Sequence, residues 1–146
     1  MFKKILFPTD LSSASLKIVP YVIEMANKFN AEAHILFVAH VRRYYSYIEL
    51  ETGFIDNFEN EIAQKADRQL KSLAAGFTGI KVKLSILRGH PSQEIISYAE
   101  SEKIDLIIMG HSSTGIERAI LGSVAGHVVK YSPVPVMVIS PEILKT

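Results

Sequence analysis

The sequence contains no cysteine and no tryptophan, and the missing cysteine excludes several chemistries. There can be no disulfide, no thiolate metal ligand and no cysteine nucleophile, and such a composition fits a reducing compartment. Lys3 and Lys4 resemble the charged start of a signal peptide, but Pro8 and Asp10 interrupt the apolar stretch that follows them. We therefore expect a cytoplasmic protein.

The chain also lacks long hydrophobic runs and an excess of charge of either sign. No apolar stretch approaches the roughly 20 residues that a membrane helix requires, so we expect no membrane span. The 16 basic residues balance the 15 acidic residues, and no run of Lys or Arg concentrates the charge. This balance argues against a nucleic-acid or membrane-surface partner. With 146 residues and 48% hydrophobic content, the chain predicts one domain spanning residues 1–146.

Strand-like and helix-like segments alternate along the whole sequence. Apolar runs, and one alternating stretch, predict five strands at residues 4–7, 33–38, 82–86, 104–109 and 136–139. Helical spacing predicts helices over residues 12–29, from about 56 to 76, from 91 onward and from 123 onward. Pro20 lies inside the first of these helices, where it should either bend the helix or mark its first turn.

Strands separated by helices indicate an α/β fold with a parallel sheet and right-handed crossovers. The strand at residues 82–86 alternates and should lie at an edge, whereas the first, second and fourth strands are apolar throughout and should be central. The order 3-2-1-4-5 satisfies these patterns. We predict a single-domain, doubly wound (Rossmann-like), five-stranded parallel sheet of order 3-2-1-4-5, with helices on both faces.

In this order the chain reverses direction between strands one and four, and ligands of such sheets bind beyond the carboxyl ends of the strands at the reversal. Pro8, Thr9 and Asp10 would therefore face the loop that follows Gly110. That loop ends in Gly122-Ser123 at a helix start, where free backbone amides and the positive end of the helix dipole attract anions. The amides of Gly122, Ser123 and Val124 are the predicted phosphate contacts.

The same segment resembles the universal stress protein family. Nucleotide-binding members carry Gly, two residues, Gly, nine residues, then Gly followed by Ser or Thr. Gly122-Ser123 matches the end of this pattern, but Ser112 occupies the position of the second glycine and only His111 separates it from Gly110. The segments LFPTDLS, RGHPSQEI and SPVPVMVI resemble further family segments in the same order.

The resemblance implies a regulatory module that binds ATP or AMP, with Mg²⁺ if the ligand is a triphosphate. Asp10 would contact the ribose or the metal, or would instead cap the helix near Ser12. Val38 would offer its backbone to adenine, or would simply end a core strand. Ser123 could add its hydroxyl or serve as an N-cap. The expected ligand-contacting residues are Pro8, Thr9, Asp10, Val38, Met109, Gly110, Ser112, Gly122, Ser123 and Val124.

The sequence also leaves an alternative function open. Ser112 and the shortened loop argue against tight triphosphate binding, and they favour a dimeric protein-interaction module of the same family without nucleotide. The apolar strand from Val134 to Ile139 should lie at an open edge, which predicts a homodimer unless the last helix and the tail from Glu142 to Thr146 cover this edge.

We expect no catalytic residue and no dedicated metal site. The sequence has neither a P-loop nor a G-x-S-x-G elbow, and its five histidines form no metal-binding motif. Slow ATP hydrolysis is a third reading, but no residue is placed as an evident general base.

Overall fold

The computed structural model describes residues 1–39, 52–111 and 122–140, with the side chains of α4 described from Asn60 onward. It contains a five-stranded sheet of order β3-β2-β1-β4-β5, in which every adjacent pair is parallel. The strands are β1 (Lys4–Pro8), β2 (Glu32–Ala39), β3 (Val82–Arg88), β4 (Leu106–Gly110) and β5 (Val136–Ile139). The predicted fold class and strand order are confirmed.

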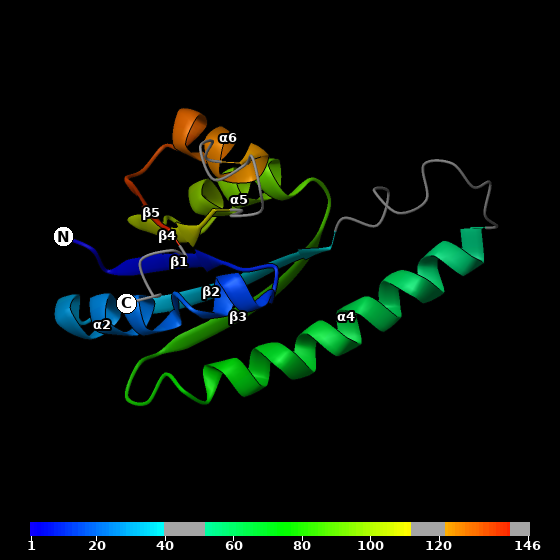
Figure 1. Cartoon of the computed structure of the whole chain (residues 1–146), viewed down its shortest axis with the longest axis horizontal. Coiled ribbons are helices and arrows are strands. Elements are labelled where there is room, and N and C mark those ends of the chain that lie inside the picture. The colour runs from blue at the N-terminus through cyan, green and yellow to red at the C-terminus, as the bar shows by residue number, and fades with distance from the viewer. Residues whose placement is uncertain (40–51, 112–121, 141–146) are drawn as a thin grey trace.

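Helices cover both faces of this sheet, as Figure 1 shows. On one face lie α1 (Ser13–Leu16), α2 (Val19–Phe29) and α4 (Thr52–Ala74), and on the other lie α5 (Pro91–Ser101) and α6 (Ser123–Tyr131). Val22 and Leu70 pack with Phe7 of β1 on the first face, whereas Tyr98 and Val128 pack with Leu6 on the second. Successive residues of β1 thus point to opposite faces, and both faces are buried, which explains its continuous apolar run.

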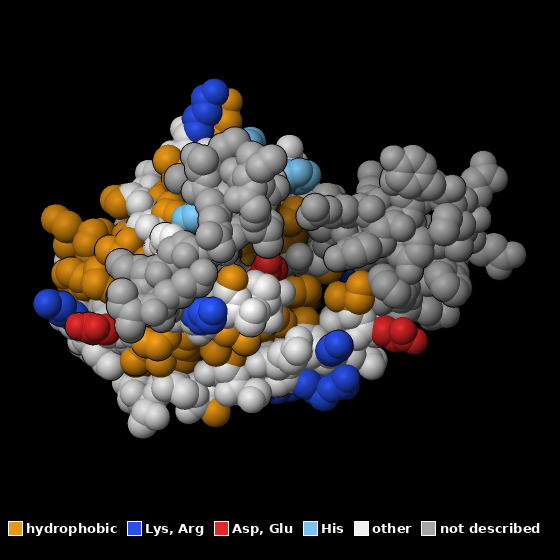
Figure 2. All heavy atoms as spheres, viewed as in Figure 1, with side chains coloured by type: hydrophobic (Ala, Val, Ile, Leu, Met, Phe, Trp, Pro, Cys, Tyr) orange, Lys and Arg blue, Asp and Glu red, His pale blue; other side chains and the backbone are white. Residues whose placement is uncertain are grey.

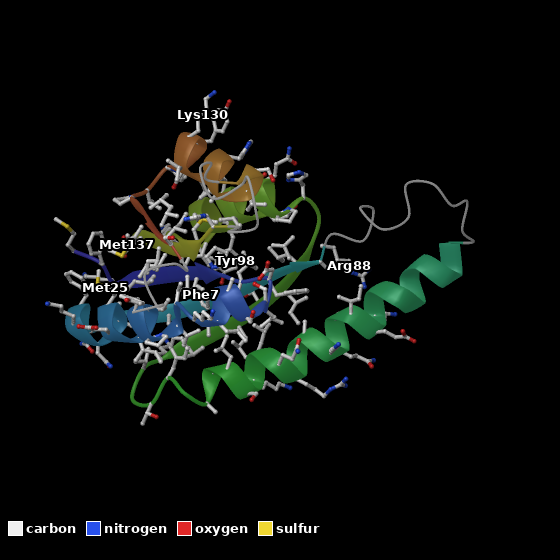
Figure 3. The ribbon with its side chains drawn as sticks, in the orientation of Figure 1. Phe7, Met25, Arg88, Tyr98, Lys130 and Met137 are labelled. Carbon is white, nitrogen blue, oxygen red and sulfur yellow. The ribbon has the colours of Figure 1, made fainter. Side chains whose placement is uncertain are left out.

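Each of the two edge strands has an accessible side. Lys81, just before β3, and Lys83, within β3, are exposed. Charged side chains of this kind are expected on an edge strand, because they disfavour pairing with another chain. Arg88 ends β3 and points toward α4, where its guanidinium donates to Asn60 Oδ1 at 3.0 Å (Figure 3). At the other edge, β5 pairs only with β4 in the described chain, and Met137 keeps 36% of its surface exposed.

The first predicted helix is divided in the structure. Residues 12–29 form two helices with a break at Lys17 and Ile18, because Pro20 occupies the first turn of α2 and Ile18 is its N-cap. Of the two roles predicted for Pro20, the structure has the second. The long helix α4 begins at Thr52, four residues before the predicted start, and Figure 1 shows its N-terminal part extending past the sheet.

Apolar side chains also gather on the surface. Figure 2 shows them over α2 and close to the N-terminus, with Lys, Arg, Asp and Glu side chains beside them and on other parts of the surface in this view. Met1 is 97% exposed, and Phe29 is partly exposed while its ring packs edge-on against Phe2. None of the helices within the described ranges combines the length and the apolar composition needed to cross a bilayer.

Candidate functional site

The loop after β1 is shaped by the hydroxyl of Thr9, which is almost completely buried. Its Oγ1 accepts the backbone N–H of Leu11 at 2.9 Å and lies 2.7 Å from the Ser15 hydroxyl. Leu11 adopts a left-handed backbone with φ of 63°, which is strained for a leucine. Thr9 therefore organises the loop from inside, a role that the sequence did not predict for it.

Asp10 follows Thr9 and is exposed at the carboxyl end of β1. One of its carboxylate oxygens, Oδ1, accepts the N–H of Ser12 at 2.9 Å, which closes a local turn. The helix cap itself is Ser12, whose hydroxyl oxygen accepts the N–H of Ser15. The capping role considered for Asp10 thus belongs to Ser12, and the carboxylate of Asp10 is left accessible at the end of the strand.

Val38 lies in β2 beyond the last residue that pairs with the neighbouring strand β1. The last residue pair between these strands is Pro8 with Leu36, and the carbonyl of Leu36 accepts the N–H of Thr9 at 2.9 Å. Alternate residues of a strand direct their backbone groups to the same side, so the N–H and C=O of Val38 point to the β1 side, beyond the last pair. Its side chain packs in the same cluster as Met109. This geometry makes the backbone of Val38 a suitable hydrogen-bonding edge.

The first turn of α6 begins at a glycine. Gly122 is the N-cap with φ of 81° and ψ of 159°, and no side chain among the described residues caps the helix. A β-branched residue would resist this conformation strongly. The first helical backbone bond runs from the N–H of Gly126 to the carbonyl of Gly122, so the four preceding amides, of Gly122 to Ala125, have no acceptor within the helix. The alternative N-cap role for Ser123 is wrong, because Ser123 is the first helical residue.

Gly110 ends β4 without a special backbone conformation. It is the last residue of the strand, its φ is not positive, and an added Cβ would meet nothing closer than 3.7 Å. The strand therefore does not need a glycine at this position for backbone freedom. Met109 is buried in the core. Ser112 lies outside the described residues, so the consequence of the shortened loop stays a prediction.

A groove of about 250 Å³ opens beside Asp10 on the face covered by α4. Phe37 of β2 and Ala66 of α4 supply apolar lining, and Lys65 and Gln69 add polar groups from α4. Sequence reasoning missed these α4 residues, because Lys65 and Gln69 belong to no motif and each directly precedes a buried position of the helix, Ala66 and Leu70. Among the described residues, no group of three or more His, Asp or Glu side chains is arranged to hold a metal ion.

Taken together, the strand order, the exposed carboxylate after β1 and the glycine start of α6 define a doubly wound fold in which a helix N-terminus without a side-chain cap among the described residues follows β4. The Universal stress protein family model matches residues 1–140. The chain belongs to the universal stress protein family.

Individual relatives agree with this assignment. Universal stress protein MJ0531 of Methanocaldococcus jannaschii is 37% identical, over 95% of this chain and 82% of that protein. The solved structure of MJ0577, from the same organism, is 33% identical and superposes with a TM-score of 0.84 over 96% of both chains. A universal stress protein in complex with cAMP (20% identity, TM-score 0.72, covering 96% and 98% of the chains) shares the fold. The structure of Arabidopsis thaliana At3g01520 with AMP bound also shares the fold, with 15% identity and a TM-score of 0.59 over 94% of this chain and 91% of that chain.

Proposed function

We propose that this protein is a regulatory module that binds an adenine nucleotide, ATP or AMP, in the crevice between the carboxyl ends of β1 and β4. The observation that carries the proposal is the start of α6, where Gly122 holds a positive φ and leaves the first-turn amides without a side-chain cap. Family relatives crystallised with cAMP and with AMP support the choice of an adenine nucleotide.

Each residue has a defined task in this proposal. The phosphates lie against the amides from Gly122 to Ala125, since these donors and the helix dipole favour negative charge. The backbone of Val38 recognises the base at the end of β2. Asp10 accepts hydrogen bonds from the ribose hydroxyls, or helps to hold Mg²⁺ together with phosphate oxygens when the ligand is a triphosphate. Pro8, Thr9, Met109 and Gly110 form the strand ends around the ligand.

We also propose that the protein binds rather than turns over its nucleotide, and that it acts in the cytoplasm. The absence of cysteine supports a reducing compartment. Along β1 and the loop after it, Asp10 is the one carboxylate, and its Oδ1 already accepts the N–H of Ser12. In this proposal the accessible carboxylate of Asp10 contacts the ribose or Mg²⁺ and does not activate water.

Isothermal titration calorimetry with ATP, ADP and AMP, each with and without Mg²⁺, tests the proposal. We expect saturable binding of at least one nucleotide at one site per chain. A Mg²⁺ requirement shared by ATP and ADP but not by AMP would indicate that the metal contacts the β-phosphate. If none of the three nucleotides gave a heat of binding at millimolar concentration, with or without Mg²⁺, the proposal would be contradicted.

The second candidate function is a dimeric protein-interaction module, favoured by the open edge of β5. Pairing through the segment Val134 to Ile139 would satisfy the free backbone edge and cover Met137. Two copies that meet about a two-fold axis would form a closed dimer. Light scattering at micromolar concentration distinguishes a dimer from a monomer. The two functions are compatible, and a dimer that binds no nucleotide would favour the second alone.

A further inference from the structure

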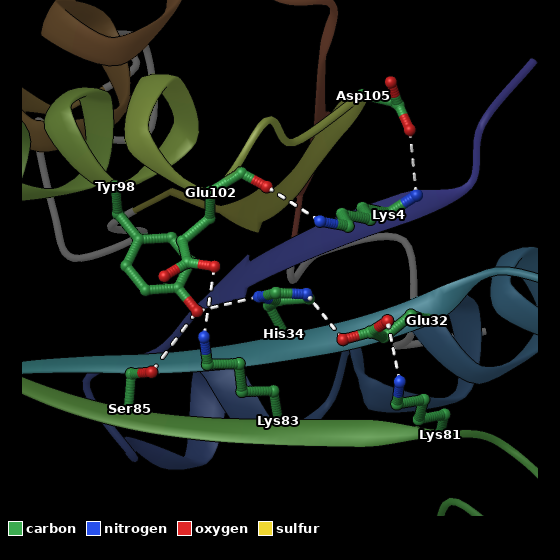
Figure 4. A network of polar contacts seen from close by, with 9 residues as sticks. All are labelled: Lys4, Glu32, His34, Lys81, Lys83, Ser85, Tyr98, Glu102 and Asp105. Atoms are coloured by element: carbon green, nitrogen blue, oxygen red, sulfur yellow. Dashed lines mark hydrogen bonds and ion pairs between the residues drawn. The ribbon is translucent and has the colours of Figure 1, made fainter.

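A buried histidine near the amino end of the sheet contacts a residue that is distant in the sequence. His34 belongs to the interior strand β2 and is 1% exposed. Its Nδ1 lies 2.7 Å from the hydroxyl of Tyr98 on α5, and the two rings meet edge-on with centroids 5.7 Å apart. The Tyr98 hydroxyl also lies 3.2 Å from the hydroxyl of Ser85 on β3. Figure 4 shows this connection between two strands and one helix.

The second ring nitrogen determines which tautomer is favoured. His34 Nε2 lies 3.0 Å from the Glu32 carboxylate, but the direction does not meet hydrogen-bond geometry. A neutral ring with its proton on Nε2 avoids placing a lone pair against this negative charge. Nδ1 then accepts the hydroxyl proton of Tyr98, and the oxygen of Tyr98 accepts that of Ser85. Each hydroxyl donates to the next group in the chain.

Charged groups from the surrounding elements face this pair. Burial is the largest influence and lowers the pKa of His34. The carboxylates of Glu32 on β2 and Glu102 at the end of α5 oppose this shift. The ammonium groups of Lys83 on β3 and Lys4 on β1 lower the pKa further. Burial also raises the pKa of Tyr98, so its hydroxyl keeps its proton across the neutral range.

Two ion pairs and a charged hydrogen bond close the outer side of the network. Lys83 Nζ lies 3.0 Å from Glu102 Oε2, and Lys4 Nζ donates to the backbone carbonyl of Glu102 at 3.2 Å. Lys81 Nζ lies 3.7 Å from the second oxygen of Glu32. The contacts of Lys83 and Lys4 tie the C-terminal end of α5 to the strands on either side of β2, and the whole network lies at the amino end of the sheet, opposite the proposed nucleotide site.

We propose that His34 and Tyr98 form a proton-sensitive clasp that fastens α5 to β2, and that proton uptake by His34 loosens it. An imidazolium ring cannot accept the Tyr98 hydroxyl, so the whole hydrogen-bond chain to Ser85 must reverse. The new cation is also almost completely shielded from water, which is costly. Tyr98 packs against the ring, so hydration of His34 requires the last turns of α5 to move away.

The sign of the pH effect follows from these contacts. The pKa of His34 in the folded protein is lower than its ordinary value of 6.5. The clasp is therefore fully stable above about pH 6.5 and is weakened as the pH falls from there toward the folded pKa. Within that interval, each unit by which the pH falls raises the equilibrium constant for opening by up to about tenfold, because the open state binds one more proton.

Hydrogen exchange of the full chain at about pH 7.5 and about pH 5.5 tests this proposal. The ratio of protection in α5 to protection in α2 cancels the general effect of pH on exchange chemistry. We expect this ratio to fall by up to about tenfold at the lower pH. His34→Leu should abolish the change in ratio, whereas His127→Gln, which removes a partly exposed histidine on α6, should leave it as in the unmodified protein.

Three results would overturn the proposal: a ratio that does not change with pH, a change that persists in His34→Leu, or an equal loss of protection in α2 and α5. If His34→Leu does not fold, NMR titration of the unmodified protein decides the matter. We expect the His34 ring to titrate below pH 6.5 and to carry its neutral proton on Nε2. Titration at or above pH 6.5, or a proton on Nδ1, would contradict the clasp.

Discussion

Replacing Thr9 with valine should loosen the loop that carries Asp10. Valine has nearly the same shape as threonine but cannot accept the N–H of Leu11 or bond with the hydroxyl of Ser15. An unsatisfied buried donor costs about 1–3 kcal/mol, and the left-handed conformation of Leu11 stores about 1–3 kcal/mol of strain that these bonds help to retain. Because both partners are only partly buried, water recovers some of the loss, and we expect Thr9→Val to destabilise the fold by about 1–2 kcal/mol.

Urea denaturation of Thr9→Val and Thr9→Ser, measured side by side, separates the hydroxyl from the methyl group. Serine keeps both hydrogen bonds and loses one methyl group, worth about 0.8 kcal/mol. We expect Thr9→Val to be the less stable variant and, if the loop carries the ligand, to bind nucleotide more weakly than Thr9→Ser. A Thr9→Val protein as stable as Thr9→Ser would refute the role assigned to the hydroxyl.

Two further changes address assembly and the phosphate loop. Met137→Lys should convert a dimer to a monomer in light scattering and leave the core intact. Met137 is the exposed residue of β5, whereas Val136 and Val138 pack against the side of the sheet that α5 and α6 cover. An unchanged dimer mass would exclude pairing at this edge. Replacing Ser112 with glycine and inserting one residue after Gly110 should strengthen ATP binding in calorimetry, because it restores the family spacing. No gain in affinity would show that this loop does not limit binding.

Local patterns predicted the fold because each element carries its own signal. The buried runs of β1, β2 and β4 differ from the alternation of β3, and this difference places β3 at an edge and the other three strands inside the sheet. The order of the interior strands also rested on the resemblance to the family. The division of the first helix was missed because apolar residues continue at helical spacing through Lys17 and Ile18. Pro20 was the local sign of a helix start.

The site was predictable where it depends on backbone conformation and not where it depends on distant contacts. Gly122 was recognisable, since a glycine before a helical pattern indicates a special backbone position. The approach of Lys65 and Gln69 to Asp10 depends on the placement of α4 against β2, which no motif encodes. His34 and Tyr98 are 64 positions apart, and only the packing of α5 over the sheet brings them together.

The most direct test of the central claim compares nucleotide binding by Gly122→Val and Gly79→Val. Both glycines hold a positive φ, of 81° and 77°, so a valine is strained at either position, but Gly79 precedes β3 at the opposite end of the sheet and an added Cβ there meets nothing within 4 Å. With folding checked by circular dichroism, calorimetry should show that Gly79→Val binds ATP or AMP as the unmodified protein does, whereas Gly122→Val has lost measurable binding. Equal affinity in the two variants would contradict a phosphate site at the start of α6.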